Sequence, residues 1–483
     1  MADAVVVGSG PNGLAAAVIL ARAGLAVEVY EAEPSAGGGS RTVELTLPGF
    51  RHDLCAGAHP MASASPFFRA FDLPAHGVEL LTPEVSYAHP LDGGRAGVAW
   101  RDLDRTVDGL GRDGAAWRRL FAPMVRHWEA VVEVAMSDLR RLPRDLLTAA
   151  RFGLRVVEQG TPLWNLRFDD EPAASMLTGV ATHAITPPRA IPAAGAGMLL
   201  GTLAHAGGWG LPRGGSQAIP DALIAELERL GGRVHTDHRI DSLDEFPDEP
   251  VLLDLSPAEL LRIGGHRLPD RYADRLRDFR YGGAACKVDF ALSGPVPWTA
   301  EDCARAGTLH LVGTRSEAVA AERAVAAGRH ADRPYVLAIQ PGVVDSTRAP
   351  AGNHTFYTYA HVPNGSPRDV SAAVVAQVER FAPGFTDLIL AKHVITAAEM
   401  PEHNANYIGG DISAGAMSLR QFLFRPAPRW NPYATPVPGV YLCSSATPPG
   451  PGVHGMNGLH AARHVLRSRF GIHTDPLGLL RRG

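Results

Sequence analysis

Three glycines near the N-terminus have the spacing of a diphosphate-binding turn. They belong to the string Gly8-Ser9-Gly10-Pro11-Asn12-Gly13. The first glycine permits a tight turn, the second lets the backbone approach a pyrophosphate, and the third lets a helix pack on a strand. Glu31 follows 18 residues after Gly13, where a carboxylate can accept hydrogen bonds from ribose hydroxyls. This spacing predicts a dinucleotide site for a ribose that carries no phosphate.

Two histidines lie in further glycine-containing segments and could transfer protons. His59 belongs to the segment 56–60, and His454 lies in the glycine-rich loop 448–458. Imidazole titrates near neutral pH, so both are candidate catalytic acid/base groups, with His403 as a third candidate. Because the chain has 20 histidines, a packed or surface position is the alternative for each.

The hydrophobic pattern predicts the elements that position these groups. Residues 4–7 read as a buried strand, 14–23 as an apolar helix that Gly24 ends, and 26–30 as a second strand. Together they predict a βαβ unit in which the glycine turn opens the helix. The positive end of the helix dipole then faces the phosphates.

A second glycine cluster follows Glu31 and favours FAD over NAD. Residues 32–41 read Ala-Glu-Pro-Ser-Ala-Gly-Gly-Gly-Ser-Arg. These glycines would let the backbone wrap a second stretch of a long dinucleotide, and Arg41 can reach its phosphates. An NAD-binding domain would continue into a helix instead. The FAD-binding residues predicted in this region are Ala32, Gly38, Ser40 and Arg41.

The pattern from residue 8 to residue 41 resembles the flavoprotein superfamily of amine oxidases, phytoene desaturases and Rab GDP-dissociation inhibitors. The next segment, LPGFRHDLCAGAHP (residues 47–60), is similar to the phytoene desaturase branch, in which such a segment leads to the flavin edge. The resemblance implies that Gly57, Ala58 and His59 contact the cofactor.

The C-terminal region carries a more specific match. GVYLCSSATPPGPGVHGMNGLHAARHVL (residues 439–466) resembles the C-terminal signature of carotenoid desaturases and related FAD-dependent oxidoreductases. It predicts a short strand 440–443, a glycine-rich loop that can lie flat against a planar ligand, and a helix 457–467. The residues expected near the isoalloxazine ring are Gly452, Val453, His454 and Met456, with Ser445 nearer the ribityl and phosphate groups.

A central segment resembles the part of the family that returns the chain to the nucleotide domain. LPRGGSQAIPDALIAELERLGGRVHTDHRIDSL (residues 211–243) predicts a helix 219–230 and then a strand that ends near Ile240. The resemblance implies that the backbone of Ile240 contacts adenine. The chain departs from the family pattern at Gly39, where an arginine is usual, and at Cys55 and Ser444, where a glycine is common.

These segments predict an α/β fold with two discontinuous domains. A Rossmann-like FAD-binding domain is expected at residues 1–75, 205–262 and 430–483, and an α+β substrate domain at 76–204 and 263–429. The substrate domain should contain an antiparallel sheet, because residues 284–292, 335–340 and 354–361 have the character of strands. A helical stretch over residues 113–157, divided at Pro143, should cap that sheet.

Composition and charge limit the partners. The chain has 483 residues, and Lys+Arg 46 against Asp+Glu 50 give a net charge of -4, so no nucleic-acid partner is expected. The four cysteines form no C-x-x-C pair, which predicts neither disulfides nor a metal site and favours a reducing compartment. Neither a signal peptide nor an apolar run of membrane-spanning length is recognised. A cytoplasmic protein is therefore expected, and the sequence does not indicate its oligomeric state.

An arginine-rich helical stretch leaves two interpretations open. Eight arginines lie between residues 118 and 155 among leucine, valine, phenylalanine and tryptophan. Such a stretch could be a membrane-peripheral surface that collects a lipid-soluble substrate. The alternative is a solvated face over an ordinary core, which is common for basic helices in a chain of this composition.

The main functional hypothesis is an FAD-dependent oxidoreductase of the phytoene desaturase-like type. It would transfer hydride between a hydrophobic substrate, such as a polyene, isoprenoid or lipid, and the flavin, and so introduce or rearrange C=C bonds. A non-redox binding module like the GDP-dissociation inhibitors is one alternative, and an amine oxidase is another. The lysine–water relay of amine oxidase relatives is assigned to neither Lys287 nor Lys392. Asp53 is expected to fix a loop as a hydrogen-bond acceptor and not to act as a base.

Overall fold

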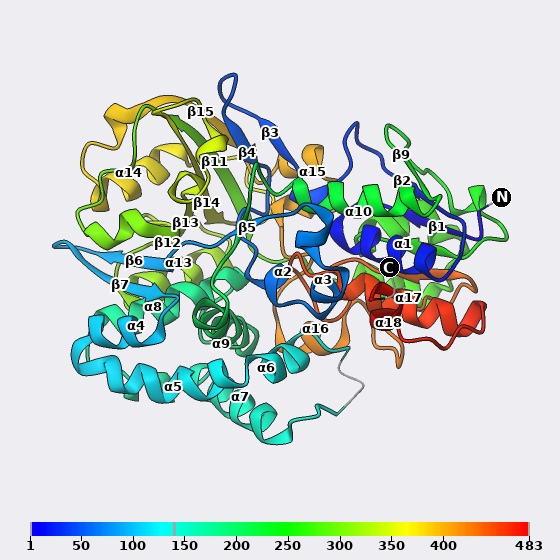
Figure 1. The fold of residues 1–483 in the computed structure, drawn as a ribbon, viewed down its shortest axis with the longest axis horizontal. Coiled ribbons are helices and arrows are strands. Elements are labelled where there is room, and N and C mark those ends of the chain that lie inside the picture. The colour runs from blue at the N-terminus through cyan, green and yellow to red at the C-terminus, as the bar shows by residue number, and fades with distance from the viewer. Residues whose placement is uncertain (1, 139–141, 482–483) are drawn as a thin grey trace.

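The computed structural model describes residues 2–138 and 142–481, which form two separate main sheets with helices around them (Figure 1). The smaller sheet is parallel and the larger one is mostly antiparallel. This mixed α/β architecture confirms the fold class predicted from the sequence. Within the described residues, no helix combines the length and the apolar character needed to cross a bilayer.

The parallel sheet gathers strands from three distant parts of the chain in the order β16-β10-β1-β2-β9. Its strands are β1 (Ala4–Val7), β2 (Val27–Tyr30), β9 (Arg233–His235), β10 (Val251–Leu253) and β16 (Val440–Leu442). All four strand pairs are parallel, so the carboxyl ends of these strands meet at one edge. In open α/β sheets, ligands bind at that edge.

Three helices pack together beside this sheet. They are α1 (Pro11–Arg22), α10 (Ala218–Arg229) and α17 (Met456–Arg469). A continuous buried run of apolar residues in α1 makes this packing possible. Pro11 stands at the first position of α1, where its missing N–H costs nothing.

The larger sheet has seven strands in the order β15-β11-β14-β13-β12-β6-β7. They are β6 (Val85–Leu91), β7 (Arg95–Trp100), β11 (Ala284–Leu292), β12 (Ala306–Leu311), β13 (Val336–Ile339), β14 (His354–Val362) and β15 (Ile389–Ile395). Neighbours are antiparallel except for β12 and β6, which are parallel. Two short antiparallel pairs complete the strands: the hairpin of β3 (Thr42–Glu44) and β4 (Arg51–Asp53), and the distant segments β5 (Leu80–Leu81) and β8 (Leu211–Pro212).

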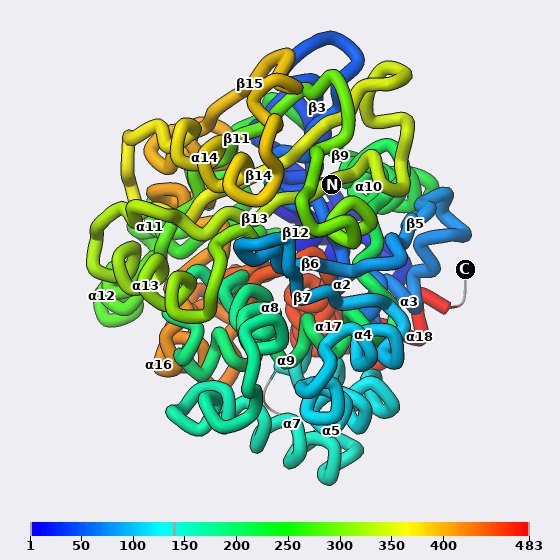
Figure 2. Tube along the Cα trace, turned by 90° about the vertical axis from the view of Figure 1, so that its left-hand side faces the viewer, coloured from blue at the N-terminus to red at the C-terminus, as the bar shows by residue number. Residues whose placement is uncertain are grey.

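A helical group lies at one end of the larger sheet, where Figure 2 shows α5, α7 and α9 together. It consists of α4 (Leu103–Gly109), α5 (Gly114–Arg126), α6 (Trp128–Ala135), α7 (Leu146–Gln159), α8 (Glu171–Ala181) and α9 (Ile191–Ala206). Helix α9 contacts α5, α6, α7 and α8 and is apolar on nearly all sides, as a central helix must be. The remaining helices are α2 (Pro60–Ala64), α3 (Pro66–Phe71), α11 (Pro257–Gly264), α12 (Asp270–Arg277), α13 (Arg315–Ala326), α14 (Ser371–Phe381), α15 (Met400–His403), α16 (Leu419–Phe424) and α18 (Pro476–Leu480).

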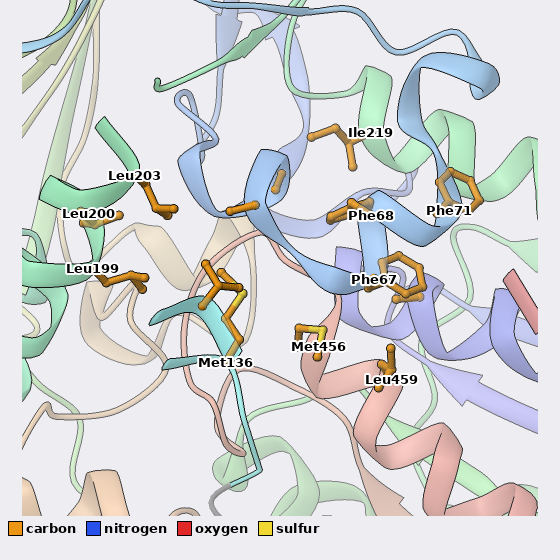
Figure 3. Packing of buried hydrophobic residues seen from close by; sticks show 14 of the residues in the cluster. Phe67, Phe68, Phe71, Met136, Leu199, Leu200, Leu203, Ile219, Met456 and Leu459 are labelled. Atoms are coloured by element: carbon orange, nitrogen blue, oxygen red, sulfur yellow. The ribbon is translucent and has the colours of Figure 1, made fainter. Parts of the chain in front are cut away.

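One apolar cluster joins the helices of the parallel sheet to the helical group (Figure 3). Phe67 of α3, Ile219 of α10 and Leu459 of α17 belong to it, and so does Leu203 of α9. Phe67 is completely buried, so its truncation to alanine should cost about 3–5 kcal/mol of folding free energy. The cluster therefore fixes the two halves of the molecule relative to each other.

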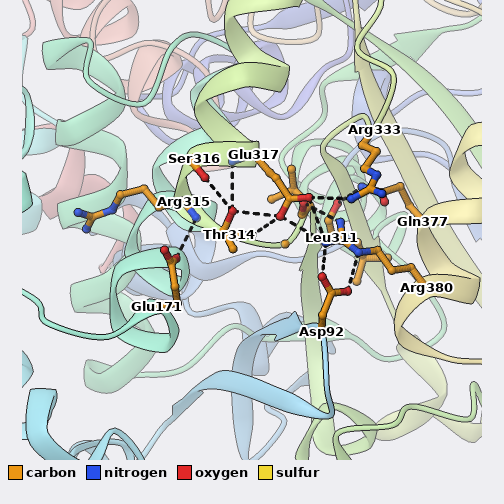
Figure 4. Close-up of polar contacts among 12 residues, drawn as sticks. Asp92, Glu171, Leu311, Thr314, Arg315, Ser316, Glu317, Arg333, Gln377 and Arg380 are labelled. Atoms are coloured by element: carbon orange, nitrogen blue, oxygen red, sulfur yellow. Dashed lines mark hydrogen bonds and ion pairs between the residues drawn. The ribbon is translucent and has the colours of Figure 1, made fainter.

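A polar cluster ties α13 and α14 to the edge of the larger sheet (Figure 4). The guanidinium of Arg380 on α14 forms an ion pair with Asp92, which follows β6, and another with Glu317 on α13. Thr314 caps α13, and Glu317 reaches back to the N–H of Thr314 at 2.8 Å. This capping box satisfies donors that the helix itself leaves unpaired.

Most of the elements predicted from the sequence are found near their expected positions, but some of their bounds differ, and the described part of residues 113–157 forms three helices, α5, α6 and α7, where two divided at Pro143 were predicted. Helix α1 begins at Pro11, before the predicted residue 14. Strand β9 ends at His235, so Ile240 lies beyond the strand that was expected to contain it. Arg140 and Arg141 of the arginine-rich stretch lie outside the described residues.

The domain boundaries remain a prediction. The five strands of the parallel sheet lie in the segments predicted for the FAD-binding domain, and the seven strands of the larger sheet lie in the other segments.

Candidate functional site

A cavity of about 690 Å³ extends from the carboxyl edge of the parallel sheet to the larger sheet and the helical group. Sixteen residues of the predicted cofactor set line it: Gly8, Gly10, Pro11, Asn12, Glu31, Ala32, Gly38, Ser40, Arg41, Gly57, Ala58, His59, Ile240, Ser445, Gly452 and Val453. Four predicted residues are not part of its wall: Ser9, Gly13, His454 and Met456. Segments far apart in the sequence thus converge on one space.

The glycine turn after β1 is packed too tightly for side chains. Gly8 has φ +95°, and a Cβ on Gly10 would lie 2.5 Å from Oδ2 of Asp254. Asp254 follows β10, and its Oδ2 accepts the N–H of Gly13 at 2.9 Å. Gly10, the N-cap of α1, supplies no side-chain hydrogen bond. Pro11 has no N–H, and Leu14 donates its N–H to the carbonyl of Gly10 at 2.9 Å. The N–H of Asn12 is therefore the first-turn donor of α1 that stays available to an anion in the cavity.

Glu31 is fixed at the end of β2 with acceptor capacity to spare. Its Oε2 accepts the N–H of Ser9 at 2.9 Å and the Ser9 hydroxyl at 2.5 Å, and its Oε1 accepts the N–H of Glu33 at 3.0 Å. A carboxylate offers about four acceptor positions. The one that is left suits a ribose hydroxyl, because Glu31 lines the cavity.

Arg41 is buried in the cavity wall and held by several contacts. Its Nε donates to the carbonyl of Gly38 at 3.1 Å, and its Nη2 donates to the carbonyl of His403 at 2.5 Å. Burial, and then the charge of Arg41, lower the pKa of His403 to about 4. His403 is not part of the cavity wall. Its contacts give it a role in holding Arg41.

His59 lines the cavity as a neutral imidazole. Burial is the main reason that its pKa falls to about 4. Ser216 donates its hydroxyl to the carbonyl of Ala56 at 2.6 Å, so at 2.8 Å it accepts a hydrogen bond from Nε2 of His59. The lone pair then lies on Nδ1, a buried atom without a hydrogen-bond partner among the described residues. This tautomer leaves His59 with an unused acceptor.

His454 is completely buried inside its own loop. Its Nδ1 accepts the N–H of Met456 at 3.1 Å, and its Nε2 lies 3.3 Å from the carbonyl of Gly450. Its own carbonyl accepts the hydroxyl of Ser65 at 2.5 Å. Both ring nitrogens are thus engaged in fixing the loop before α17. The contacts favour a structural role over the acid/base role expected from the sequence.

Asp53 anchors the hairpin β3-β4, as expected of a loop-fixing acceptor. Its Oδ1 accepts the Thr42 hydroxyl at 2.6 Å and the N–H of Ser216 at 2.8 Å. Arg348 donates Nη2 to its Oδ2 at 2.8 Å. Burial alone would raise the pKa of Asp53, but Arg348 and the hydrogen bonds outweigh burial and hold that pKa below its usual value.

The wall away from the nucleotide end is mostly apolar and, among the described residues, carries no Asp, Glu, Lys or Arg. Its residues come from α7, α9, α16, the segment just before α16, and β12 to β14, and they include Phe152, Val156, Leu199, Leu200, Leu337, Ile339, Tyr357, Tyr359, Met417 and Phe422. None of the described wall residues between 134 and 209 or between 308 and 423 is Asp, Glu, Lys or Arg. The charged wall residues all lie in residues 31–41 and 239–262.

Sequence reasoning missed two polar features of the cavity. Asp254 directly follows a buried strand of the parallel sheet, which is a recognisable signal. Burial, and then the charge of Glu31, raise its pKa to about 7. His183 has no such signal. It lines the cavity, and its Nε2 lies 2.8 Å from Nε2 of His310 on β12.

The two lysines stay outside the cavity wall. Lys287 on β11 forms a buried ion pair with Asp289, and its Nζ lies 4.1 Å from the centroid of the Tyr357 ring. Lys392 donates to the Ser371 hydroxyl at 2.8 Å. The described residues also contain no group of three or more His, Cys, Asp or Glu side chains that could hold a metal ion.

The nucleotide end of the cavity fits FAD. Two buried polar atoms there, Oδ1 of Asn12 and Oγ of Ser40, have no partner among the described residues, as expected where a ligand supplies one. A Cβ on Gly38 would lie 2.9 Å from Cα of Gly10, so the two glycine segments meet at the cavity. The cavity continues past the site for a dinucleotide into the apolar region, where a flavin ring would meet a substrate. Fold and site together define an FAD-dependent oxidoreductase.

The chain belongs to the flavin-containing amine oxidoreductase family, whose model matches residues 12–263. Pyridine nucleotide-disulfide oxidoreductase domain-containing protein 2 of Rattus norvegicus is 26% identical over 557 residues, covering 96% of this chain and 93% of that protein. A neurosporene-forming phytoene desaturase of Rhodobacter capsulatus is 31% identical over 130 residues, covering 25% of this chain and 24% of that protein. A component of the limonene dehydrogenase of Castellaniella defragrans is 34% identical over 123 residues, covering 25% of this chain and 22% of that protein.

Solved structures share the fold. Putrescine oxidase bound to putrescine has a TM-score of 0.60 at 16% identity, covering 97% of this chain and 99% of that one. An oxidoreductase from Methanosarcina mazei has a TM-score of 0.58 at 16% identity, covering 96% of this chain and 100% of that one. At this identity the likeness concerns the fold alone.

Proposed function

We propose that this flavoprotein dehydrogenates an apolar, unsaturated substrate of the isoprenoid or lipid type, and so introduces C=C bonds. The observation that carries the proposal is the uncharged wall of the cavity beyond the nucleotide end. Transferring a charged substrate group into such a space without a partner is costly, whereas an apolar chain gains free energy there. Two local relatives are named for phytoene and limonene.

The residues of the chain supply shape, dryness and a proton acceptor. Bound FAD would accept a hydride equivalent from an activated C–H bond of the substrate. The apolar side chains of α7, α9 and α16 exclude water from the reacting carbon. Nδ1 of His59 is an unprotonated acceptor on a ring that lines the cavity, so we assign uptake of the accompanying proton to His59.

Amine oxidation is the second candidate, and aromatic wall residues favour it. Tyr357, Tyr359 and Trp209 line the cavity, and an amine can be held against aromatic faces. The rings of Tyr357 and Tyr359 lie edge to face, with centroids 6.1 Å apart and planes at 82°. They therefore do not form a parallel pair with a slot between them. The family argues against the other alternative, a non-redox binding module, because its members are flavin-containing oxidoreductases.

An anaerobic reduction experiment distinguishes these candidates. The FAD-loaded protein is mixed without oxygen with carotenoid and isoprenoid polyenes, with unsaturated lipids, and separately with primary amines and polyamines. We expect the flavin absorbance band to bleach with members of the first group alone, and mass spectrometry to find a product two hydrogens lighter. Bleaching by amines alone, with release of an aldehyde, would replace the proposal by amine oxidation.

A further inference from the structure

Large apolar side chains are exposed on two segments beside the cavity. Of the twelve strongly exposed large apolar residues on the described chain, nine lie in residues 142–157 and 419–430: Leu142, Leu146, Leu147, Leu154, Val157, Leu419, Leu423, Phe424 and Trp430. Trp430 is 87% exposed and Leu142 is 85% exposed. Clusters of this kind mark interaction surfaces, whereas single exposed apolar residues need no explanation. We call these two segments the apolar face.

The apolar face is continuous with the cavity wall. Helix α7 turns Phe152 and Val156 into the cavity and Leu154 to the outside. Leu419 and Leu423 of α16 contribute to both surfaces, because they line the cavity and are also about half exposed to solvent. Figure 1 shows α16 and α7 on the same lower side of the molecule, and both helices contact α9. The cavity therefore opens to the outside through an apolar surface.

The charges on the apolar face are almost all positive. Four exposed arginines accompany the leucines: Arg144, Arg151, Arg420 and Arg429. Residues 412–430 contain no Asp or Glu, and residues 142–157 contain only Asp145. Asp145 caps α7 by accepting the N–H and the hydroxyl of Thr148 at 2.9 and 2.6 Å. Glu133 on the neighbouring α6 forms an ion pair with Arg144 at 3.8 Å, so the exposed arginines outnumber the nearby acids by four to two.

This charge pattern favours a membrane over a second copy of the chain as the partner of the apolar face. In a two-fold dimer the same patch meets itself, so arginines would face arginines in a low-dielectric contact. An anionic bilayer offers phosphates for the arginines and an acyl region for the leucines, and Trp430 is suited to the boundary between them. Each exposed arginine should raise the partition coefficient onto an anionic surface by about fivefold.

We propose that the apolar face of residues 142–157 and 419–430 docks on an anionic lipid bilayer and opens the cavity to it. An apolar substrate then passes from the acyl region to the cavity without crossing water. The proposal requires no particular reaction, because it rests on the surface and not on the chemistry. Docking on a bilayer and the identity of the substrate can therefore fail separately.

The test measures co-sedimentation of the FAD-loaded full chain with vesicles. Vesicles of phosphatidylcholine with phosphatidylglycerol are compared with vesicles of phosphatidylcholine alone. We expect binding to the anionic vesicles that weakens as salt rises, and at least a tenfold loss of binding in Leu147→Ser/Leu154→Ser/Trp430→Ser. None of these three side chains lines the cavity. The matched control is Leu390→Ser on β15, which is 49% exposed and lies outside the apolar face.

Flavin absorbance and thermal unfolding of each variant verify that the fold and the cofactor site are intact. Absence of binding to either vesicle would overturn the proposal, and so would a triple variant that binds like the unchanged protein. Light scattering gives the third outcome. A dimer that the triple variant converts to a monomer, without vesicle binding by either, would show that the apolar face is an interface between copies.

Discussion

Oδ2 of Asp254 accepts the N–H of Gly13 at 2.9 Å, and so joins the end of β10 to the first turn of α1. The same carboxyl oxygen would lie 2.5 Å from a Cβ on Gly10. The acidic side chain thus supports the turn that is to receive phosphates, although its charge would repel them. Burial and the nearby charge of Glu31 reduce this conflict below pH 7, because they raise the pKa of Asp254 to about 7.

The raised pKa of Asp254 predicts a pH dependence of stability. Between the ordinary value of 3.8 and about 7 the folded chain holds a proton that the unfolded chain releases. The contribution of Asp254 to stability therefore falls as pH rises through this window and is constant above it. Asp254→Asn keeps the acceptor and removes the charge. Above pH 7 we expect this variant to gain up to about 4 kcal/mol in the free energy of unfolding.

Denaturant unfolding below and above pH 7 checks this prediction, with Asp241→Asn as the control, since Asp241 is a surface acid. FAD retention should also improve in Asp254→Asn above pH 7, because a negative charge beside the phosphates is removed. An Asp254→Asn variant whose stability follows that of the unchanged protein at every pH would contradict the prediction.

Gly10→Ala tests the cradle of the nucleotide end. The added Cβ must displace the carboxyl group of Asp254 and with it the hydrogen bond to Gly13, which should cost about 1–3 kcal/mol. We expect the purified variant to carry at least tenfold less FAD, measured by the ratio of flavin to protein absorbance. Gly265→Ala is the matched control, because no atom lies within 4 Å of the added Cβ. Equal FAD content in both variants would refute the assignment of the turn.

The sequence predicted the nucleotide end of the site better than the substrate end. Gly8, Gly10 and Glu31 are recognisable because a tight turn and a strand end impose residue types at fixed spacings. The apolar wall follows no spacing, since α7, α9 and α16 contribute to it through tertiary packing. His183 meets His310 only because η5 (Thr182–Ala184) lies against β12. Such a contact joins residues 127 positions apart and leaves no local pattern.

The histidine candidates show the same limit. A glycine-rich segment predicts that a side chain is near the cofactor, but not which way it points. His59 and His454 stand in similar segments, yet His59 lines the cavity and His454 is engaged within its own loop. Hydrogen-bond partners such as Ser216, 157 residues from His59, decide the difference.

The buried ion pair of Asp53 and Arg348 predicts a strong and asymmetric effect on stability. Both side chains are 2% exposed, and Nη2 of Arg348 lies 2.8 Å from Oδ2 of Asp53. Asp53→Asn leaves a buried guanidinium without its counter-charge and should cost about 3–5 kcal/mol. Asp53→Asn/Arg348→Met removes both charges and should recover part of that loss. Urea unfolding of the two variants measures the difference, and a double variant less stable than the single one would contradict this account.

The Asp53 pair also predicts sensitivity to acid. Because the pKa of Asp53 is held below its ordinary value of 3.8, the ionised form contributes stability above that value. This contribution is lost as pH falls through the lower pKa of the folded state. Asp53→Asn should therefore flatten the acid limb of the stability profile, as followed by circular dichroism.

Gly195 on α9 offers a test of the apolar part of the cavity without disturbing the nucleotide end. It lines the cavity, and the nearest atom to an added Cβ is Cγ1 of Val156 at 4.0 Å. Gly195→Leu should fold normally, since replacing a helical glycine favours the helix by up to about 1 kcal/mol. The new side chain would occupy space between α7 and α9. We expect unchanged FAD content, together with at least a tenfold slower anaerobic reduction by the best apolar substrate. Gly109→Leu on α4 is the control, because no atom lies within 4 Å of its Cβ and Gly109 is not in the wall. Equal reduction rates in the two variants would mean that the substrate does not pass between α7 and α9.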